Sequence, residues 1–452
     1  MDSLSGLFFV RYFKINLLTD NIKSLFTKYL LASMGSSLVM SIYSLVDTLA
    51  VGQSEGPAGA AAMAIIMPIY EIQVFLAILC GIGGSILMSN AKGGKKDQRG
   101  NEYFTAAIIL MSMLTILSWI GFIIFSKQIL FFLGANEKSL PMVMKYAKWL
   151  IRFWPIFIFP AFLSAFIRND GAPNLAMSAV IVGGLINVFG DWFFVFPLGM
   201  GIEGAAIATV IGTSAQAIIM SSHFLQKSCG LRLKKPFSMS KATRDILLIG
   251  LGSSLLDLGT VVLAVIINNQ IMRYSDSVAL AVYGVIASIS SLIQALYCGV
   301  GQAIQPIVSL NYGANKRERI RTIYNMSMLL VIVIGLLLAG LGQLFPIQIM
   351  KLFMATTPRV LEMAPKIIRI YSSIYLFLGI NVLSTYYLQS TMQDMASMLI
   401  AVFRSLASGM LLFVLPIFLG INGVWIAIPV SEFFIMAFSL VYIRKHTVKI
   451  KL

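Results

Sequence analysis

The sequence predicts an all-α polytopic membrane protein with twelve transmembrane helices in two lobes of six. The 452 residues are 58% hydrophobic and only 12% charged, about half of the charged fraction of soluble domains, and the mean hydropathy is +0.87. Apolar runs long enough to cross a bilayer as helices recur from one end of the chain to the other. A membrane β-barrel would instead require short alternating segments.

The predicted spans are 24–52, 59–91, 102–126, 140–166, 173–196, 203–225, 243–272, 277–310, 320–345, 363–388, 395–419 and 423–443. About two thirds of the 34 lysines and arginines lie in the terminal segments and in the loops on the same side. Because cytoplasmic loops carry an excess of these residues, we expect a multi-pass protein of the cell (inner) membrane with both termini in the cytoplasm. These loops also explain the net charge of +16, so no nucleic-acid partner is expected.

Three short sequences recur at nearly constant spacing. They are GSSL at 35–38 and 252–255, CGxG at 80–83 and 298–301, and GIxG at 201–204 and 420–423, with offsets of 217, 218 and 219 residues. This agreement indicates a duplication. The expected organisation is an amino-terminal six-helix lobe at 1–225, a basic cytoplasmic linker at 226–244 and a carboxy-terminal six-helix lobe at 245–452. Because six is even, both lobes begin on one side and the repeat is parallel.

The fifth predicted span contains two polar residues, Asn187 and Asp191. They are four residues apart and therefore share one helical face. A carboxylate in hydrocarbon costs several kcal/mol, so we expect it to face the protein interior or a wet cavity. One interpretation is a structural pair that joins two helices, and the other is a site for an ion or a proton.

Two further polar residues lie at a matching depth. Asp47 and Asp191 are five and six residues before the predicted outer ends of their spans, and Thr209 is six residues into the next span. At 1.5 Å per residue, each lies about 8–9 Å below the outer edge. The second lobe has no acid at the corresponding positions. The sequence therefore predicts an oxygen-lined Na⁺ site or a protonatable cluster made of Asp47, Asn187, Asp191 and Thr209.

Four more ionisable residues lie within predicted spans and are candidates for the transport route: Asp257, Glu71, Arg404 and Glu432. Each is interpreted equally well as a member of a buried ion pair or as a side chain that reaches the membrane interface. The 25 methionines and 30 phenylalanines fit ordinary packing, and they would also suit a cavity for flat cations.

The chain has no signature of enzymatic or cofactor chemistry. Its three cysteines are isolated, and its two histidines are too few for a histidine-based metal centre. The motifs GxxxxGK[ST], HExxH and GxSxG do not occur. We therefore expect no enzyme, no cofactor other than H⁺ or Na⁺ as coupling ion, and no metal other than Na⁺ at the coupling site.

Four motifs resemble those of the multidrug and toxic compound extrusion (MATE) family, and the likeness covers nearly the whole chain. Val46-Asp47-Thr48 with Val51-Gly52 resembles the helix-1 motif, and GQAIQPIVSLNYG at 301–313 resembles the helix-8 signature. RNDGAP at 168–173 and GIEGAAIAT at 201–209 resemble the loop between helices 4 and 5 and the start of helix 6.

Asn187, Asp191 and Thr209 are similar to the amino-lobe cation site of the DinF-like branch of this family. The resemblance implies a V-shaped antiporter in which these residues and Asp47 form the coupling site. The family's helix 1 often carries a proline, and this chain has none between positions 21 and 54. The NorM-like branch places acids in helices 7 and 10; Asp257 matches the first, and helix 10 offers none.

The resulting hypothesis is a secondary active multidrug efflux antiporter. It would act as a monomer in the lipid bilayer and export small cationic or aromatic compounds in exchange for H⁺ or Na⁺. The alternative is a lipid-linked oligosaccharide flippase on the related scaffold. Its anionic pyrophosphate cargo calls for a cationic cavity, whereas the intramembrane acids outnumber Arg404. A non-transporting receptor or scaffold would leave the acids at matched depth unexplained.

Overall fold

The computed structural model describes the backbone of residues 16–353 and 357–449, and all side chains in these ranges except those of 44, 45, 57, 60, 61, 256–258, 260, 261, 277 and 446–449. The regular elements of this part are all helices. They are α1 (Ile22–Gly93), α2 (Asp97–Phe132), α3 (Leu140–Arg152), α4 (Trp154–Asn169), α5 (Pro173–Gly190), η1 (Asp191–Val195), α6 (Gly201–Ser221), η2 (Ser222–Leu225), α7 (Met239–Tyr274), α8 (Ser277–Gly313), α9 (Arg317–Leu344), α10 (Pro346–Phe353), α11 (Pro358–Ser372), α12 (Tyr375–Ser390), α13 (Asp394–Leu419) and α14 (Ile421–Lys449).

Each predicted span lies almost entirely within one helix or within two consecutive helices, so the predicted all-α polytopic fold class is confirmed. Among the described residues, ten segments are long and apolar enough to cross a membrane, and the pair α3–α4, bent by 58°, makes an eleventh. The remaining predicted span, 243–272, is α7. Large apolar side chains on the outer helix faces are exposed, as a lipid environment requires; Leu117 of α2 is 60% exposed.

The first two predicted spans form one element, α1, with a sharp break at Gly56. Its φ of +64° is a left-handed value that glycine adopts without a steric cost. The first span therefore ends at Gly56 and not at 52. Asp47 is nine residues before this break, so its depth below the helix end is about 13 Å and not the expected 8–9 Å, at 1.5 Å per residue.

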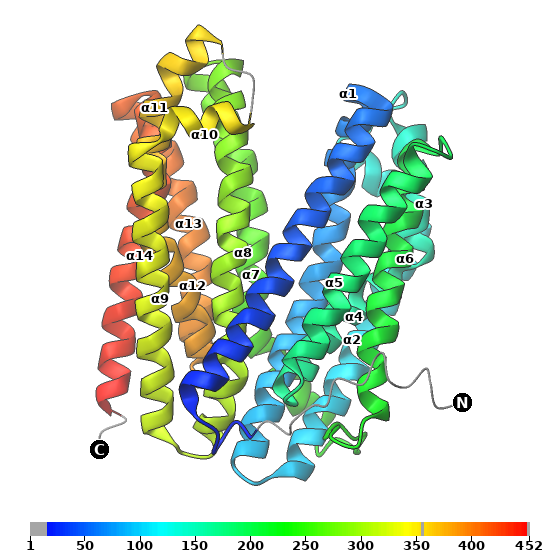
Figure 1. Ribbon diagram of the computed structural model, residues 1–452, viewed down its shortest axis with the longest axis vertical. Coiled ribbons are helices and arrows are strands. Elements are labelled where there is room, and N and C mark those ends of the chain that lie inside the picture. Colours follow the sequence, from blue (N-terminus) through cyan, green and yellow to red (C-terminus); the bar gives the residue numbers. More distant parts are fainter. Residues whose placement is uncertain (1–15, 354–356, 450–452) are drawn as a thin grey trace.

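The helices form two groups that diverge like the arms of a V (Figure 1). One group runs from α1 to η2 and the other from α7 to α14, and residues 226–238 join them without a helix. The arms are widest apart where α1 breaks and where α10 and α11 lie (Figure 1). We call this the open end, and we call the opposite end, where α1 starts and α14 finishes, the closed end.

At the closed end the two groups touch through one glycine of each group. A Cβ atom on Gly93 of α1 would overlap the carbonyl oxygen of Leu310 in α8. A Cβ atom on Gly313 of α8 would overlap the carbonyl oxygen of Asn90 in α1. The contact is therefore reciprocal, and the two helices approach this closely only because both residues lack side chains.

Hydrogen bonds between the groups also lie toward the closed end. Arg168 donates to Gln302 Oε1 at 2.8 Å, and the Tyr103 hydroxyl donates to Asp245 Oδ2 at 3.2 Å. Asn311 Nδ2 donates to the carbonyl oxygen of Leu17 at 3.0 Å. Separation of the lobes at this end would break these bonds, so they stabilise the V shape.

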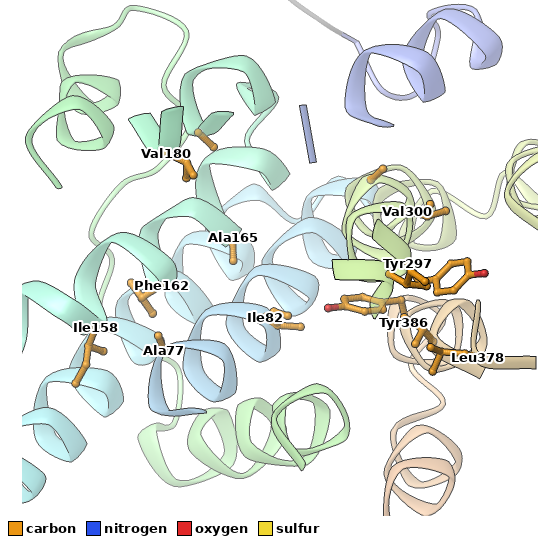
Figure 2. Packing of buried hydrophobic residues seen from close by; sticks show 14 of the residues in the cluster. Ala77, Ile82, Ile158, Phe162, Ala165, Val180, Tyr297, Val300, Leu378 and Tyr386 are labelled. Atoms are coloured by element: carbon orange, nitrogen blue, oxygen red, sulfur yellow. The ribbon is translucent and has the colours of Figure 1, made fainter. Parts of the chain in front are cut away.

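Buried apolar side chains form the core of both groups (Figure 2). In the first, Phe162 and Ala165 of α4 lie against Gly81 of α1. In the second, Tyr297 of α8 packs against Gly379 of α12. The second part of α1 and α8 are thus the central helices of their groups, and both border the space between them.

Candidate functional site

Three of the four predicted coupling-site residues are joined by hydrogen bonds inside the first group of helices. Tyr146 of α3 donates its hydroxyl hydrogen to Asp47 Oδ2 at 2.9 Å, and the same hydroxyl lies 3.3 Å from Thr209 Oγ1. Asn187 Nδ2 donates to Thr209 Oγ1 at 3.2 Å. All four side chains are at least nine-tenths buried. Residues of α1, α3, α5 and α6 therefore converge on one polar centre.

Asp191 lies beside this centre and is 1% exposed, and neither of its carboxylate oxygens has a hydrogen-bond partner among the described residues. It is the first residue of η1, where α5 changes into a π-helix. Such turns are rare and often occur at functional sites. One free oxygen on Asp47 and the amide oxygen of Asn187 are likewise without a partner.

These unpartnered oxygens are the feature that indicates a binding site. Buried acceptors without partners are costly, and a native structure retains them where an ion, a proton or water satisfies them. A cavity of about 30 Å³ borders the centre, with Asp47, Tyr146 and Thr209 in its wall. Such a volume holds one or two water molecules or a small cation. The arrangement is suited to a hard cation bound by oxygens, or to protonation of a carboxylate.

A second, larger cavity of about 470 Å³ lies between the two groups. Glu71 of α1, Arg404 of α13 and Glu432 of α14 all line it, so three of the four residues predicted along the transport route share one cavity. The fourth, Asp257, lies outside the described side chains. Aromatic and apolar residues, including Tyr283 and Tyr371, form much of the remaining wall.

Arg404 and Glu432 form a buried ion pair in the second group. Asn381 of α12 donates to the other carboxylate oxygen of Glu432 at 2.7 Å. Both members of the pair are at least nine-tenths buried, so they neutralise each other beside the cavity. Glu71 has no hydrogen bond or ion pair with any described residue, and it therefore supplies the unbalanced charge of the cavity wall.

The two cavities share the helix α1. Tyr43 and Tyr70, on either side of its break, line the small cavity, and their hydroxyl oxygens are 3.3 Å apart. Ser41 and Glu71 line the large cavity. Residues that are two or fewer positions apart on one helix thus face different cavities, and a movement of α1 alters both.

Sequence reasoning missed Tyr146, because a tyrosine is an ordinary residue in a helix that is partly apolar. It also missed Glu55, whose carboxylate accepts a hydrogen bond from the amide of Ile202 at 3.2 Å. This contact holds the break of α1 against the first turn of α6, where an acidic side chain is favourable. Glu55 directly precedes Gly56 in the sequence, and this was the one feature that could have drawn attention to it.

A third polar cluster lies at the closed end, around Asp170 in the turn between α4 and α5. Asp170 accepts hydrogen bonds from Lys92 Nζ at 2.9 Å and from the Gly230 amide at 2.7 Å, and His223 Nε2 lies 2.9 Å from it. Burial opposes ionisation of Asp170, but the bond with His223 and the charge of Lys92 together hold its pKa below the usual value. Asp170, His223 and Cys229 lie within 4.8 Å of one another, as metal ligands do. Lys92 and His223 already occupy both carboxylate oxygens, so we interpret the cluster as an ion-pair network that fastens the linker.

The comparisons with known proteins agree with this architecture. The model of the MatE family matches residues 32–193 and 239–415, which is more than half of the chain. The chain belongs to the MatE family. The family resemblance expected from the motifs is thereby confirmed; the assignment to the DinF-like branch stays a prediction.

Relatives of this MatE protein include the multidrug export protein MepA of Staphylococcus aureus (strain N315), which is 24% identical over 419 residues, or 89% of each chain. MepA of Staphylococcus saprophyticus is 23% identical over 403 residues, or 88% of each chain. A solved structure described as the outward-facing conformation of a multidrug resistance MATE family transporter has a TM-score of 0.90 at 21% identity, covering 98% of this chain and 99% of that one. A MATE structure in the bent conformation has a TM-score of 0.88. These likenesses establish a shared fold.

Proposed function

We propose that this MatE protein is a secondary active efflux antiporter that exports small organic cations in exchange for H⁺ or Na⁺. The names of its relatives support multidrug efflux. The observation that carries the mechanism is the group of buried, unpartnered carboxylate and amide oxygens of Asp47, Asn187 and Asp191. Asp47 also lines a cavity of about 30 Å³, and this supports the use of these oxygens by a coupling ion.

The large cavity is the proposed binding site for the exported compound. Its volume of about 470 Å³ lies in the usual range for small-molecule sites. Because Arg404 is paired with Glu432, Glu71 remains to attract a positive charge. Tyr283 and Tyr371 add aromatic faces that favour flat cations. The expected substrate is therefore an amphipathic compound with a single positive charge.

Coupling follows if the two ligands favour different positions of α1. With the closed end in the cytoplasm, as the basic loops predict, the V shape opens to the outside. An external H⁺ or Na⁺ that enters the Asp47 centre would satisfy its free oxygens and alter the α1 wall that contains Glu71. The drug then binds more weakly and leaves. A ligand shifts such an equilibrium only by its difference in affinity for the two states.

The flippase alternative requires a cationic cavity for a diphosphate headgroup. Of the described side chains that line the large cavity, Arg404 is the one cation, and it is already paired. This favours the antiporter.

The experiment is transport in proteoliposomes with Na⁺ and pH gradients imposed separately, with a fluorescent monocation as substrate. The proposal predicts that at least one gradient drives uptake and that Asp47→Asn abolishes this drive. Uptake that depends on neither gradient would contradict the proposal. In parallel, turnover of a lipid-linked precursor without movement of the cation would favour the flippase.

A further inference from the structure

We infer that the second group of helices carries a binding site for an anionic phospholipid at its closed end, separate from both cavities described above. A cavity of about 790 Å³ lies there among α8, α9, α12 and α14. Its rim has three arginines and one glutamate, Arg317, Arg321, Arg444 and Glu318. Basic pockets between transmembrane helices on the cytoplasmic side are the usual binding sites of acidic headgroups.

The depth of the cavity agrees with the headgroup region. Arg317 is the first residue of the span formed by α9, and Arg444 is the next to last residue of the span formed by α14. The floor comes from the end of α12, where Tyr387 and Thr391 are buried. The cavity is therefore level with the ends of three helices, where phosphate groups of the adjoining leaflet lie.

The cavity also has the two kinds of surface that a phospholipid requires. Ile320, Leu440 and Ile443 line its apolar part. Tyr324 and Tyr387 also line it, with ring centroids 4.5 Å apart and ring planes tilted by 48°. An acyl chain fits along the apolar part of the cavity, and a phosphate fits at the charged rim. A small soluble anion would gain nothing from contact with the apolar wall.

Two of the arginines are available for a phosphate. Arg321 and Arg444 are exposed, and neither has a hydrogen bond or an ion pair with a described residue. They come from different helices, α9 and α14, on opposite sides of the α12 floor. A phosphate between them would be held by charge-assisted hydrogen bonds from both sides. A headgroup with one negative charge, such as that of phosphatidylglycerol, is sufficient.

The test measures lipid retention by the purified full-length protein with native mass spectrometry, at equal concentrations of phosphatidylglycerol and phosphatidylcholine. We expect preferential retention of one phosphatidylglycerol. The double variant Arg321→Gln/Arg444→Gln should weaken this binding about tenfold or more, because two charge-assisted contacts are lost. Leu440→Trp fills the cavity without changing the charge and should weaken it as well.

The matched control is Lys234→Gln/Lys235→Gln, which removes the same charge from the exposed linker on the same side. It should leave retention unchanged. Equal losses of lipid in the two double variants would mean that a diffuse positive surface binds the lipid. Unchanged retention in Leu440→Trp would mean that the cavity does not bind the lipid. Either result overturns the inference. So would displacement of the lipid by inorganic phosphate at a similar concentration, since the occupant would then be a soluble anion.

Discussion

The hydroxyl group of Tyr146 lies 2.9 Å from Asp47 Oδ2 and 3.3 Å from Thr209 Oγ1, and so joins α1 to α6 through α3. The tyrosine satisfies one carboxylate oxygen of Asp47 and leaves the other without a partner. This second oxygen is the atom that the proposed coupling ion would contact.

Removing the Tyr146 hydroxyl should weaken the response to the coupling ion. Tyr146→Phe deletes the hydrogen bond to Asp47 and preserves the ring. A hydrogen bond to a charged group contributes about 1.5–3 kcal/mol, so the half-saturating concentration of the effective ion should change about tenfold or more. The measurement is drug transport as a function of Na⁺ concentration and pH. Tyr297→Phe, which deletes a hydroxyl bonded to the Tyr375 carbonyl oxygen in the other lobe, is the control. An equal effect of both substitutions would contradict the assigned role.

Glu71 should determine the preference for cations. Glu71→Gln removes the unbalanced charge of the large cavity, so the KM for a monocationic drug should rise about tenfold, while a neutral drug of similar shape is affected little. The measurement is competition between the two drugs in whole cells at equal expression. If Glu71→Gln weakens both drugs to the same extent, the carboxylate acts through structure and not through charge.

The Arg404–Glu432 pair should be needed for stability as a pair. Glu432→Gln leaves a buried guanidinium without its counter-charge, and loss of one partner of such a pair costs about 3–5 kcal/mol. Arg404→Met/Glu432→Met removes both charges and should recover most of the lost thermal stability in detergent. Transport by the double variant is measured as well. If the double variant is stable but does not transport, the ion pair has a role in the transport route. A double variant no more stable than Glu432→Gln would show that the charges are not each other's main partners.

The Asp170 network should give a stability that depends on pH. The pKa of Asp170 is held below the usual value in the folded protein, so the unfolded chain binds a proton more readily at this residue. Its contribution is therefore complete above the usual carboxyl range and is lost as the pH falls through the lowered value. Asp170→Asn should lower the apparent Tm at neutral pH, and its difference from the wild type should shrink in acid. A difference that stays constant from neutral pH to a pH below the usual carboxyl range would be inconsistent with this. Asp97→Asn, at an exposed position of α2, is the control.

The reciprocal glycine contact should control closure of the lobes. Gly93→Val places a side chain against the Leu310 carbonyl oxygen and should force the closed end apart. With spin labels at positions 54 and 359, on the two sides of the open end, the interlabel distance should shorten relative to the wild type. Gly121→Val is the control, because a Cβ atom at Gly121 meets nothing within 4 Å. If Gly93→Val leaves the interlabel distance unchanged, the glycine contact does not control closure of the lobes.

The sequence was sufficient for the fold class, because apolar runs and an internal repeat are local or periodic signals. It was also sufficient to nominate Asp47, Asn187, Asp191 and Thr209, since a polar side chain in an apolar span stands out. The predicted depth of Asp47 was wrong because α1 continues past 52 to Gly56. Composition places no boundary between those positions.

Other features depend on contacts between distant segments and leave no mark in the sequence. Tyr146 is 99 positions from Asp47, and nothing in its neighbourhood distinguishes it from a packing residue. The pairing of Arg404 with Glu432 likewise required the crossing of α13 and α14. The π-helix at Asp191 is a third such feature, and it contacts α6.

The central claim is that the Asp47–Asp191 centre couples an ion to the exported compound, and drug binding measured together with exchange tests it most directly. Asp47→Asn and Asp191→Asn should still bind a fluorescent monocation in detergent, with affinity within about threefold of the wild type, because Glu71 and the large cavity are intact. In proteoliposomes, both variants should lose all uptake driven by the Na⁺ or pH gradient, whereas Asp276→Asn, at the turn before α8, should retain it. If either Asp47→Asn or Asp191→Asn keeps gradient-driven uptake at the rate of the wild type, that residue does not couple transport and the proposed mechanism is wrong.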